Sequence, residues 1–169
     1  TVPHHTRDDT PPDSVRVADL NSDSDNELQL GYGYDEVIVL YNSGVIIDTS
    51  YGYEFSGDWE VTDATGNALG FIAGIAEFSR SDGSLVQRLK ETTLNAGGTP
   101  VVGDAGEFNV QISATEIAAA GITGGNHIGV FFHRDDDGSL NNDNAGFGPT
   151  LKSTKYIVDD VQLKRFRFY

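Results

Sequence analysis

Short apolar runs separated by turn residues recur along most of this chain, and they constrain the fold more than any other feature. Runs such as 36–41, 107–112 and 127–133 are rich in Val, Ile and Phe, and several alternate apolar with polar side chains. A period of two is typical of half-buried strands, and β-branched and aromatic residues favour strands. Helical stretches do not alternate with these runs, which disfavours a parallel sheet. The expected strands are residues 27–34, 36–41, 45–47, 51–55, 58–62, 69–79, 85–94, 107–112, 127–133 and 155–169.

This series predicts an all-β fold: an antiparallel β-sandwich, or jelly-roll-like single barrel, with one short helix. The helix is expected at 113–120, where Ser113 can cap the first turn and Glu116 completes a capping box. Gly121 should end it. Turn chemistry predicts breaks between strands at three places, residues 42–44, 63–67 and 81–84.

The domain organisation follows from where the apolar pattern begins. Residues 1–26 contain several prolines and acids without apolar periodicity, so they are predicted to form an extended N-terminal arm. Val15 and Val17 alternate with Arg16 and predict a short edge strand. Residues 27–169 are predicted to form the single β-sandwich domain.

The charge balance of the chain indicates a high-salt environment and disfavours nucleic acid as a partner. The chain carries 26 acidic residues against 11 Lys and Arg, a formal net charge of −15. Self-repulsion of this size is screened at about 1 M salt, where the Debye length is roughly 3 Å. A halophilic origin is therefore favoured over an ordinary acidic secreted protein. Nucleic-acid binding is disfavoured, because phosphate contacts need clustered cations.

Other partner classes are limited by what the sequence lacks. There is no cysteine, so neither a disulfide framework nor a thiolate metal site is expected. No apolar stretch approaches the roughly 18 residues of a membrane span, so no transmembrane segment is predicted. Serine-hydrolase and phosphate-binding motifs are missing, and no carboxylate pair stands out among so many acids. The chain is predicted not to be an enzyme.

Two acidic runs are candidate cation sites, although solvated loops in an acid-rich protein are the favoured explanation. Flexible loops can supply the six to eight oxygens that Ca²⁺ prefers. No other cofactor is indicated. The first candidate loop consists of Asp135, Asp137, Ser139, Asn141 and Asp143. The second alternating run consists of Asp19, Asn21, Asp23, Asp25 and Glu27.

Histidine and tyrosine pairs give weaker signals. His127 and His133 flank one expected strand and share a face about 20 Å apart, too far for one metal. His4 and His5 lie on the arm. Tyr51 and Tyr53 alternate with Gly52 and are expected on one sheet face, either as a stacking platform for a sugar or as cross-strand packing pairs.

The end of the chain carries a different charge from the rest. Residues 1–151 have a net charge of −18 and residues 152–169 one of +3. Arg165 and Arg167 alternate with Phe166 and Phe168, and a bulge is expected after Val161 and Leu163, where the facing parity changes. Arginine and aromatic residues favour interfaces, so Lys164, Arg165, Phe166, Arg167 and Phe168 are predicted to form a subunit contact. A plain final strand is the alternative.

Composition and strand series together resemble one protein family. The acidic surface, the missing cysteine, the polar arm and the jelly-roll-like strands over 27–169 resemble the small single β-barrel capsid proteins of icosahedral haloarchaeal viruses. That resemblance implies upright barrels that assemble as homo- or hetero-oligomers over an internal membrane. It predicts a structural virion protein whose partners are other capsid subunits.

Local stretches resemble secreted modules instead. Asp35–Gly44 with Phe55–Asn67 looks like the lamin-tail immunoglobulin-like module, and Tyr156–Leu163 is similar to the last strand of many carbohydrate-binding jelly rolls. These resemblances imply the alternative function, a secreted or cell-surface haloarchaeal β-sandwich module that binds carbohydrate or protein.

Overall fold

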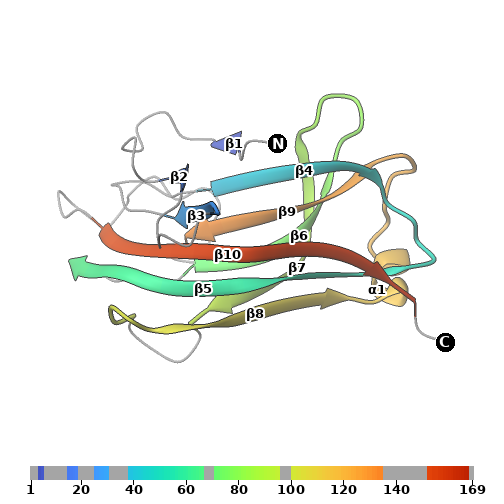
Figure 1. The fold of residues 1–169 in the computed structure, drawn as a ribbon. Coiled ribbons are helices and arrows are strands. Elements are labelled where there is room, and N and C mark those ends of the chain that lie inside the picture. Colours follow the sequence, from blue (N-terminus) through green and yellow to red (C-terminus); the bar gives the residue numbers. More distant parts are fainter. Residues whose placement is uncertain are drawn as a thin grey trace.

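Two five-stranded antiparallel sheets pack face to face in the computed structural model, which confirms the predicted all-β sandwich (Figure 1). The structure describes residues 4–5, 15–18, 25–30, 38–66, 71–95, 100–134 and 152–167. Its elements are β1 (His4–His5), β2 (Val15–Ala18), β3 (Glu27–Leu30), β4 (Ile38–Ile46), β5 (Gly52–Gly66), β6 (Phe71–Phe78), β7 (Leu85–Leu94), β8 (Ala105–Ile112), α1 (Ala114–Ala119), β9 (His127–Arg134) and β10 (Lys152–Phe166).

The order of strands puts β5 and β10 at the centre of one sheet. That sheet runs β2-β3-β10-β5-β8, and the other runs β1-β4-β9-β6-β7. β7 and β8 contact each other, so they form one edge of the sandwich. β4 lies across from β3 and β10 at the opposite edge (Figure 1). Pieces of the predicted arm, β1 and β2, pair with β4 and β3; β2 is the edge strand expected near Val15.

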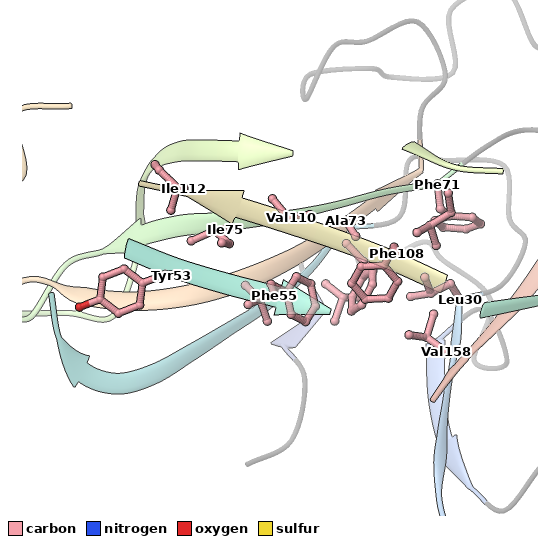
Figure 2. Packing of buried hydrophobic residues seen from close by; sticks show 14 of the residues in the cluster. Leu30, Tyr53, Phe55, Phe71, Ala73, Ile75, Phe108, Val110, Ile112 and Val158 are labelled. Carbon is pink, nitrogen blue, oxygen red and sulfur yellow. The ribbon is translucent and has the colours of Figure 1, made fainter. Parts of the chain in front are cut away.

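The core lies between the sheets, where alternate residues of each strand meet. Figure 2 shows rings and aliphatic side chains from both sheets interleaved in this layer. Phe55 packs edge-on against Phe108 and Phe132, with ring centroids 5.0 and 5.6 Å away. Edge-to-face contacts of this kind add to the free energy gained by burying the rings. A smaller buried cluster, Ile72, Ala76, Phe78 and Phe131, packs separately.

Two local predictions are confirmed: the helix cap at Ser113 and Glu116, and the turn at residues 81–84. Ser113 accepts a hydrogen bond from the Glu116 amide, and the Glu116 side chain accepts one from the Ser113 amide, so the capping box is present. Residues 81–84 connect β6 and β7 as a hairpin, with Gly83 at φ 75°.

Two predicted turns are wrong. Residues 42–44 form a bulge inside β4, where the register with β9 shifts between Asn42 and Val45. Gly44 has φ 73°, so the glycine serves the bulge as it would have served a turn. Residues 63–67 were expected to turn, yet β5 continues to Gly66 because residues 63–66 pair with the start of β10.

A buried carboxylate anchors the segment between α1 and β9. Glu77 on β6 is fully buried. It accepts hydrogen bonds from Gln87 Nε2 at 2.6 Å, Asn126 Nδ2 at 2.7 Å and the Thr123 amide at 3.0 Å. Lys90 on β7 also bonds Glu116 on α1, with Nζ and Oε1 2.6 Å apart. These contacts attach the helical end of the molecule to β6 and β7.

Candidate functional site

An apolar cleft lies at the β4/β10 edge of the sandwich. Two short strands leave this space open. On β10, β3 covers only Tyr156–Val158, and on β4, β1 covers only Val39 and Leu40. Beyond these points, no described strand covers β4 or the rest of β10 on that side. The space between the sheets therefore opens outward as a cleft of about 710 Å³.

Core side chains line this cleft together with polar residues, most of which are exposed. The apolar lining includes Leu28, Val39, Phe55, Val130, Phe132 and Leu163. Asn26, Ser43, Asp160, Lys164 and Arg165 are among its polar residues. An apolar cavity with few polar groups is the usual form of a small-molecule site.

Bulges occur in both strands that border the cleft. The register of β10 against β5 shifts between Asp159 and Gln162, and Asp160 has φ 49°. The bulge expected between Leu163 and Phe166 is wrong, because β10 pairs regularly with β5 from Gln162 to Phe166 and the bulge lies earlier in the strand. The bulge in β4 includes Ser43, which also lines the cleft. Bulges redirect side chains and interrupt pairing, and they are common beside functional sites.

Cationic side chains gather on one aromatic ring next to the cleft. The guanidinium carbons of Arg165 and Arg167 lie 4.7 and 4.8 Å from the centroid of the Tyr51 ring. Cation–π contacts hold such groups in place while their N–H donors stay available. The pKa of the nearby Asp48 carboxyl is lowered, chiefly by hydrogen bonds from the Ser50 hydroxyl and amide and to a smaller extent by the two guanidiniums.

Of the two alternatives for Tyr51 and Tyr53, the structure favours packing over an open stacking platform. Tyr53 is 3% exposed and belongs to the core, where its hydroxyl oxygen accepts a hydrogen bond from the Asp48 amide at 2.8 Å. Burial raises the pKa of Tyr53. Tyr51 is covered by the two arginines. A sugar therefore has no pair of open tyrosine rings here.

A second, polar groove lies at the opposite edge, between β7 and β8, and has a volume of about 430 Å³. Trp59, the only tryptophan in the chain, lines it together with residues that carry carboxylate, amide and hydroxyl groups. These residues are Thr92, Thr93, Asn95, Asp104, Glu107 and Asn109.

Gly106 explains why Trp59 reaches this groove. The two residues pair across β5 and β8. A Cβ atom at position 106 would lie 3.0 Å from Cζ2 of the indole, so the ring occupies the space that a side chain there would need. The other side of the indole approaches Tyr156, with ring centroids 5.9 Å apart. Burial raises the pKa of Tyr156 to about 12.

Asp104 organises the loop that borders this groove. Its Oδ2 accepts hydrogen bonds from Asn95 Nδ2 at 3.1 Å and from the Val101 amide at 2.9 Å. The amide of Asp104 donates in turn to the Val101 carbonyl at 2.9 Å. Neither this groove nor the role of Trp59 was predicted from the sequence. The signal that could have found it is a glycine inside a strand, which often marks a close approach.

Only two of the predicted cation ligands, Asp25 and Glu27, are among the residues that the structure describes. The loop of Asp135, Asp137, Ser139, Asn141 and Asp143 lies outside the described residues, as do Asp19, Asn21 and Asp23. Asp25 and Glu27 from the second run meet Asp159 of β10, with one carboxylate oxygen of each within 4.8 Å of the others. Acidic clusters of this spacing also occur without an ion, so the cluster alone does not establish a metal site.

The remaining predicted site residues fall at the end of β10. Lys164, Arg165 and Arg167 are exposed and Phe166 is partly buried, packed over Gly52. Phe168 lies outside the described residues. The predicted subunit contact stays a prediction.

His133 is fully buried on β9, at the opposite end of the strand from His127.

Comparisons with known proteins identify the fold but not a family. No protein-family model and no curated protein matches the chain. Among solved structures, a xylan-binding domain (CBM22-1) from Paenibacillus barcinonensis is similar over 92% of this chain and 82% of its own, with a TM-score of 0.50 and 12% identity. A cyclase from Fischerella sp. TAU, in complex with 4-(1H-indol-3-yl)butan-2-one, is similar over 88% of this chain and 67% of its own, with a TM-score of 0.53 and 11% identity.

A third similar structure is the enzymatically active domain of tailspike protein 4 from bacteriophage CBA120, with a TM-score of 0.53 and 10% identity. The similarity covers 98% of this chain but only 19% of the tailspike chain. Identities this low establish the sandwich fold alone. None of these findings links the chain to haloarchaeal capsids. No helix in the described part of the chain is long and apolar enough to cross a membrane.

Proposed function

We propose that this chain is a non-catalytic binding module and that the groove at Trp59 holds a short segment of carbohydrate. The observation that carries the proposal is the indole of Trp59, held across Gly106 at the edge of a groove rich in polar side chains. Sugars present both an apolar C–H face and a ring of hydroxyls. An aromatic ring beside carboxylate, amide and hydroxyl groups complements both parts.

The groove is also preorganised, which lowers the entropic cost of binding. Its loop is held by the hydrogen bonds of Asp104, and its indole is confined between Gly106 and Tyr156. The fold supports the proposal at a coarser level, since the similar Paenibacillus barcinonensis domain is named for binding xylan.

The single tryptophan makes the experiment direct. Soluble xylo-, cello- and manno-oligosaccharides, preceded by a glycan array to choose the sugar, are titrated while Trp59 emission is recorded. We expect a saturable change in emission for at least one glycan, because the ligand would displace water from the indole. A folded protein that shows no saturable binding to any glycan on the array would contradict the proposal.

Two exposed amides on β8 provide a matched pair of variants. Asn109 lines the groove, whereas Gln111 lies two residues further along the strand, outside it, and bonds Glu54. Asn109→Ala should weaken glycan binding by roughly tenfold, the equivalent of about one hydrogen bond. Gln111→Ala should leave the affinity unchanged. Trp59→Phe, measured by calorimetry, should also weaken binding.

A further inference from the structure

We infer that the cleft between β4 and β10 is a second binding site, and that it takes an amphipathic anion: an apolar chain or ring carrying one carboxylate or sulfonate group. The apolar part would fill the cleft, and the anionic group would meet Arg165 at its mouth. This site is separate from the Trp59 groove and does not depend on carbohydrate binding.

The interior of the cleft selects an apolar ligand body. Its lining includes Phe55, Val130, Phe132 and Leu163, which belong to or pack against the core between the sheets. A volume of about 710 Å³ lies within the range of roughly 300–1,000 Å³ that is typical of small-molecule sites. A sugar would leave most of its hydroxyls without partners against such a surface.

Three of the six large apolar side chains that are exposed among the described residues lie at this edge. Val45 and Ile46 on β4 are 53% and 51% exposed, and Val161 on β10 is 49% exposed. Val45 and Val161 both line the cleft. An apolar patch that continues into a cavity is a mark of a binding surface rather than of scattered surface residues.

Positive charge beside the cleft favours a negative charge on the polar group of the ligand. In a chain with a net charge of −15, Lys164, Arg165 and Arg167 place three cations within four residues near the end of β10. Asp159 and Asp160 also line the cleft, but they lie at the bulge in β10, before Lys164 and Arg165, so the anionic group is assigned to the Arg165 end of the cleft. Arg165 lines the cleft and also stacks on Tyr51, so its guanidinium is held where a ligand in the cleft can reach it. Guanidinium groups bind carboxylates through paired hydrogen bonds.

The geometry of the two strands that border the cleft argues against a second protein chain as the occupant. An added strand needs a regular row of free N–H and C=O groups, and the bulges at Ser43 and Asp160 interrupt both rows. Bulges and charged residues such as Lys164 are the devices that prevent pairing between sheet edges. A small ligand does not need an uninterrupted edge.

The test compares three probes with the same alkyl chain: dodecanoate, dodecanol and dodecyltrimethylammonium, each titrated calorimetrically below its micelle concentration. Dodecanoate should bind one site per chain, and the cationic probe should bind at least roughly tenfold more weakly, since it lacks the charge-assisted hydrogen bonds. Equal binding of all three probes would contradict recognition of an anion.

Matched variants locate the site. Arg165→Gln should weaken dodecanoate binding, whereas Arg88→Gln should not, because Arg88 stacks on Phe131 at 5.6 Å and does not line the cleft. Val161→Asp should abolish binding, and Val86→Asp, at a valine 48% exposed, should not. Circular dichroism checks that each variant is folded.

Two results would overturn the inference. If Val161→Asp binds dodecanoate normally, the ligand does not occupy this cleft. If light scattering shows that copies associate and that only Val161→Asp dissociates them, the surface is an interface between copies instead. Glycan binding at Trp59 should be unaffected by Val161→Asp, so failure here is distinguishable from failure of the proposed carbohydrate function.

Discussion

The two edges of this sandwich differ in how completely strands close the space between the sheets, and this difference determines the kind of ligand that we expect at each edge. At the β7/β8 edge the strands contact each other, and α1 is tied to β7 by the Lys90–Glu116 pair. What remains there is a shallow polar groove. At the β4/β10 edge the covering strands stop early and both border strands bulge, so the apolar interior is open. One core thus supplies a surface for hydroxyl groups on one side and for hydrocarbon on the other.

The largest expected effect tests whether the helical end depends on its buried carboxylate. Glu77→Ala should lower the free energy of unfolding by roughly 3 kcal/mol, because it leaves one buried and two partly buried donors without their shared acceptor. Chemical denaturation measures this change. Glu54→Ala is the matched control, since Glu54 accepts a hydrogen bond of the same 2.6 Å length from Gln111 but is more exposed. If both variants lose a similar free energy of unfolding, burial does not make the Glu77 hydrogen bonds more stabilising than the exposed Glu54 bond.

The next largest effect is expected at Gly106, where the lack of a side chain leaves space for the Trp59 indole. Gly106→Val should destabilise the fold by about 1–3 kcal/mol through overpacking, and it should shift Trp59 emission as the ring is displaced. Gly124→Val provides the control, because no atom lies within 4 Å of its expected Cβ. Unchanged emission in Gly106→Val would show that the position of the indole does not depend on this glycine.

Acid should weaken the contact between α1 and β7. Hydrogen bonds from Lys90 first, and then from Ser113, lower the pKa of Glu116 from 4.5 to about 2. A lowered pKa in the folded state stabilises the protein above the unfolded pKa, and this stabilisation is lost as pH falls from about 4.5 to about 2. Thermal melts across this range should show a smaller acid-induced drop in Tm for Glu116→Gln. Glu91→Gln removes another exposed carboxylate and should keep the full drop.

The smallest expected effect is at the open edge. Val161→Thr should change the free energy of unfolding by less than about 0.5 kcal/mol, because the side chain is already half exposed. Val158→Thr, three residues earlier and 1% exposed, should cost roughly 1–3 kcal/mol for burying a hydroxyl group. Equal costs at both positions would mean that the cleft is closed in solution.

Local side-chain chemistry explains which parts of this structure were predictable. Asp82–Gly83 and the Ser113–Glu116 pair act within a few residues, and both formed as expected. The sandwich itself followed from alternation. Residues 63–66 failed because pairing with β10, which lies about 90 residues away in the chain, overrode their turn propensity.

The sites were less predictable because they depend on where strands stop. The cleft exists because β3 covers only three residues of β10, and no pattern in residues 27–34 indicates that length. The role of Tyr53 stayed open between a sugar platform and a packing pair, because tyrosine is compatible with both faces of a sheet. Gly106 acquires its role only when it lies opposite Trp59. The capsid role, the virion location and the halophilic origin stay predictions.

The long pairing of β5 with β10 also has a consequence for how quickly the molecule can fold. Partners in this ladder, from Gly66 with Lys152 to Gly52 with Phe166, are separated by about 86 to 114 residues. Joining such distant segments requires closure of a large loop before any contact compensates for the lost chain entropy. Refolding in stopped-flow experiments should accordingly take milliseconds to seconds, as in other domains dominated by non-local contacts.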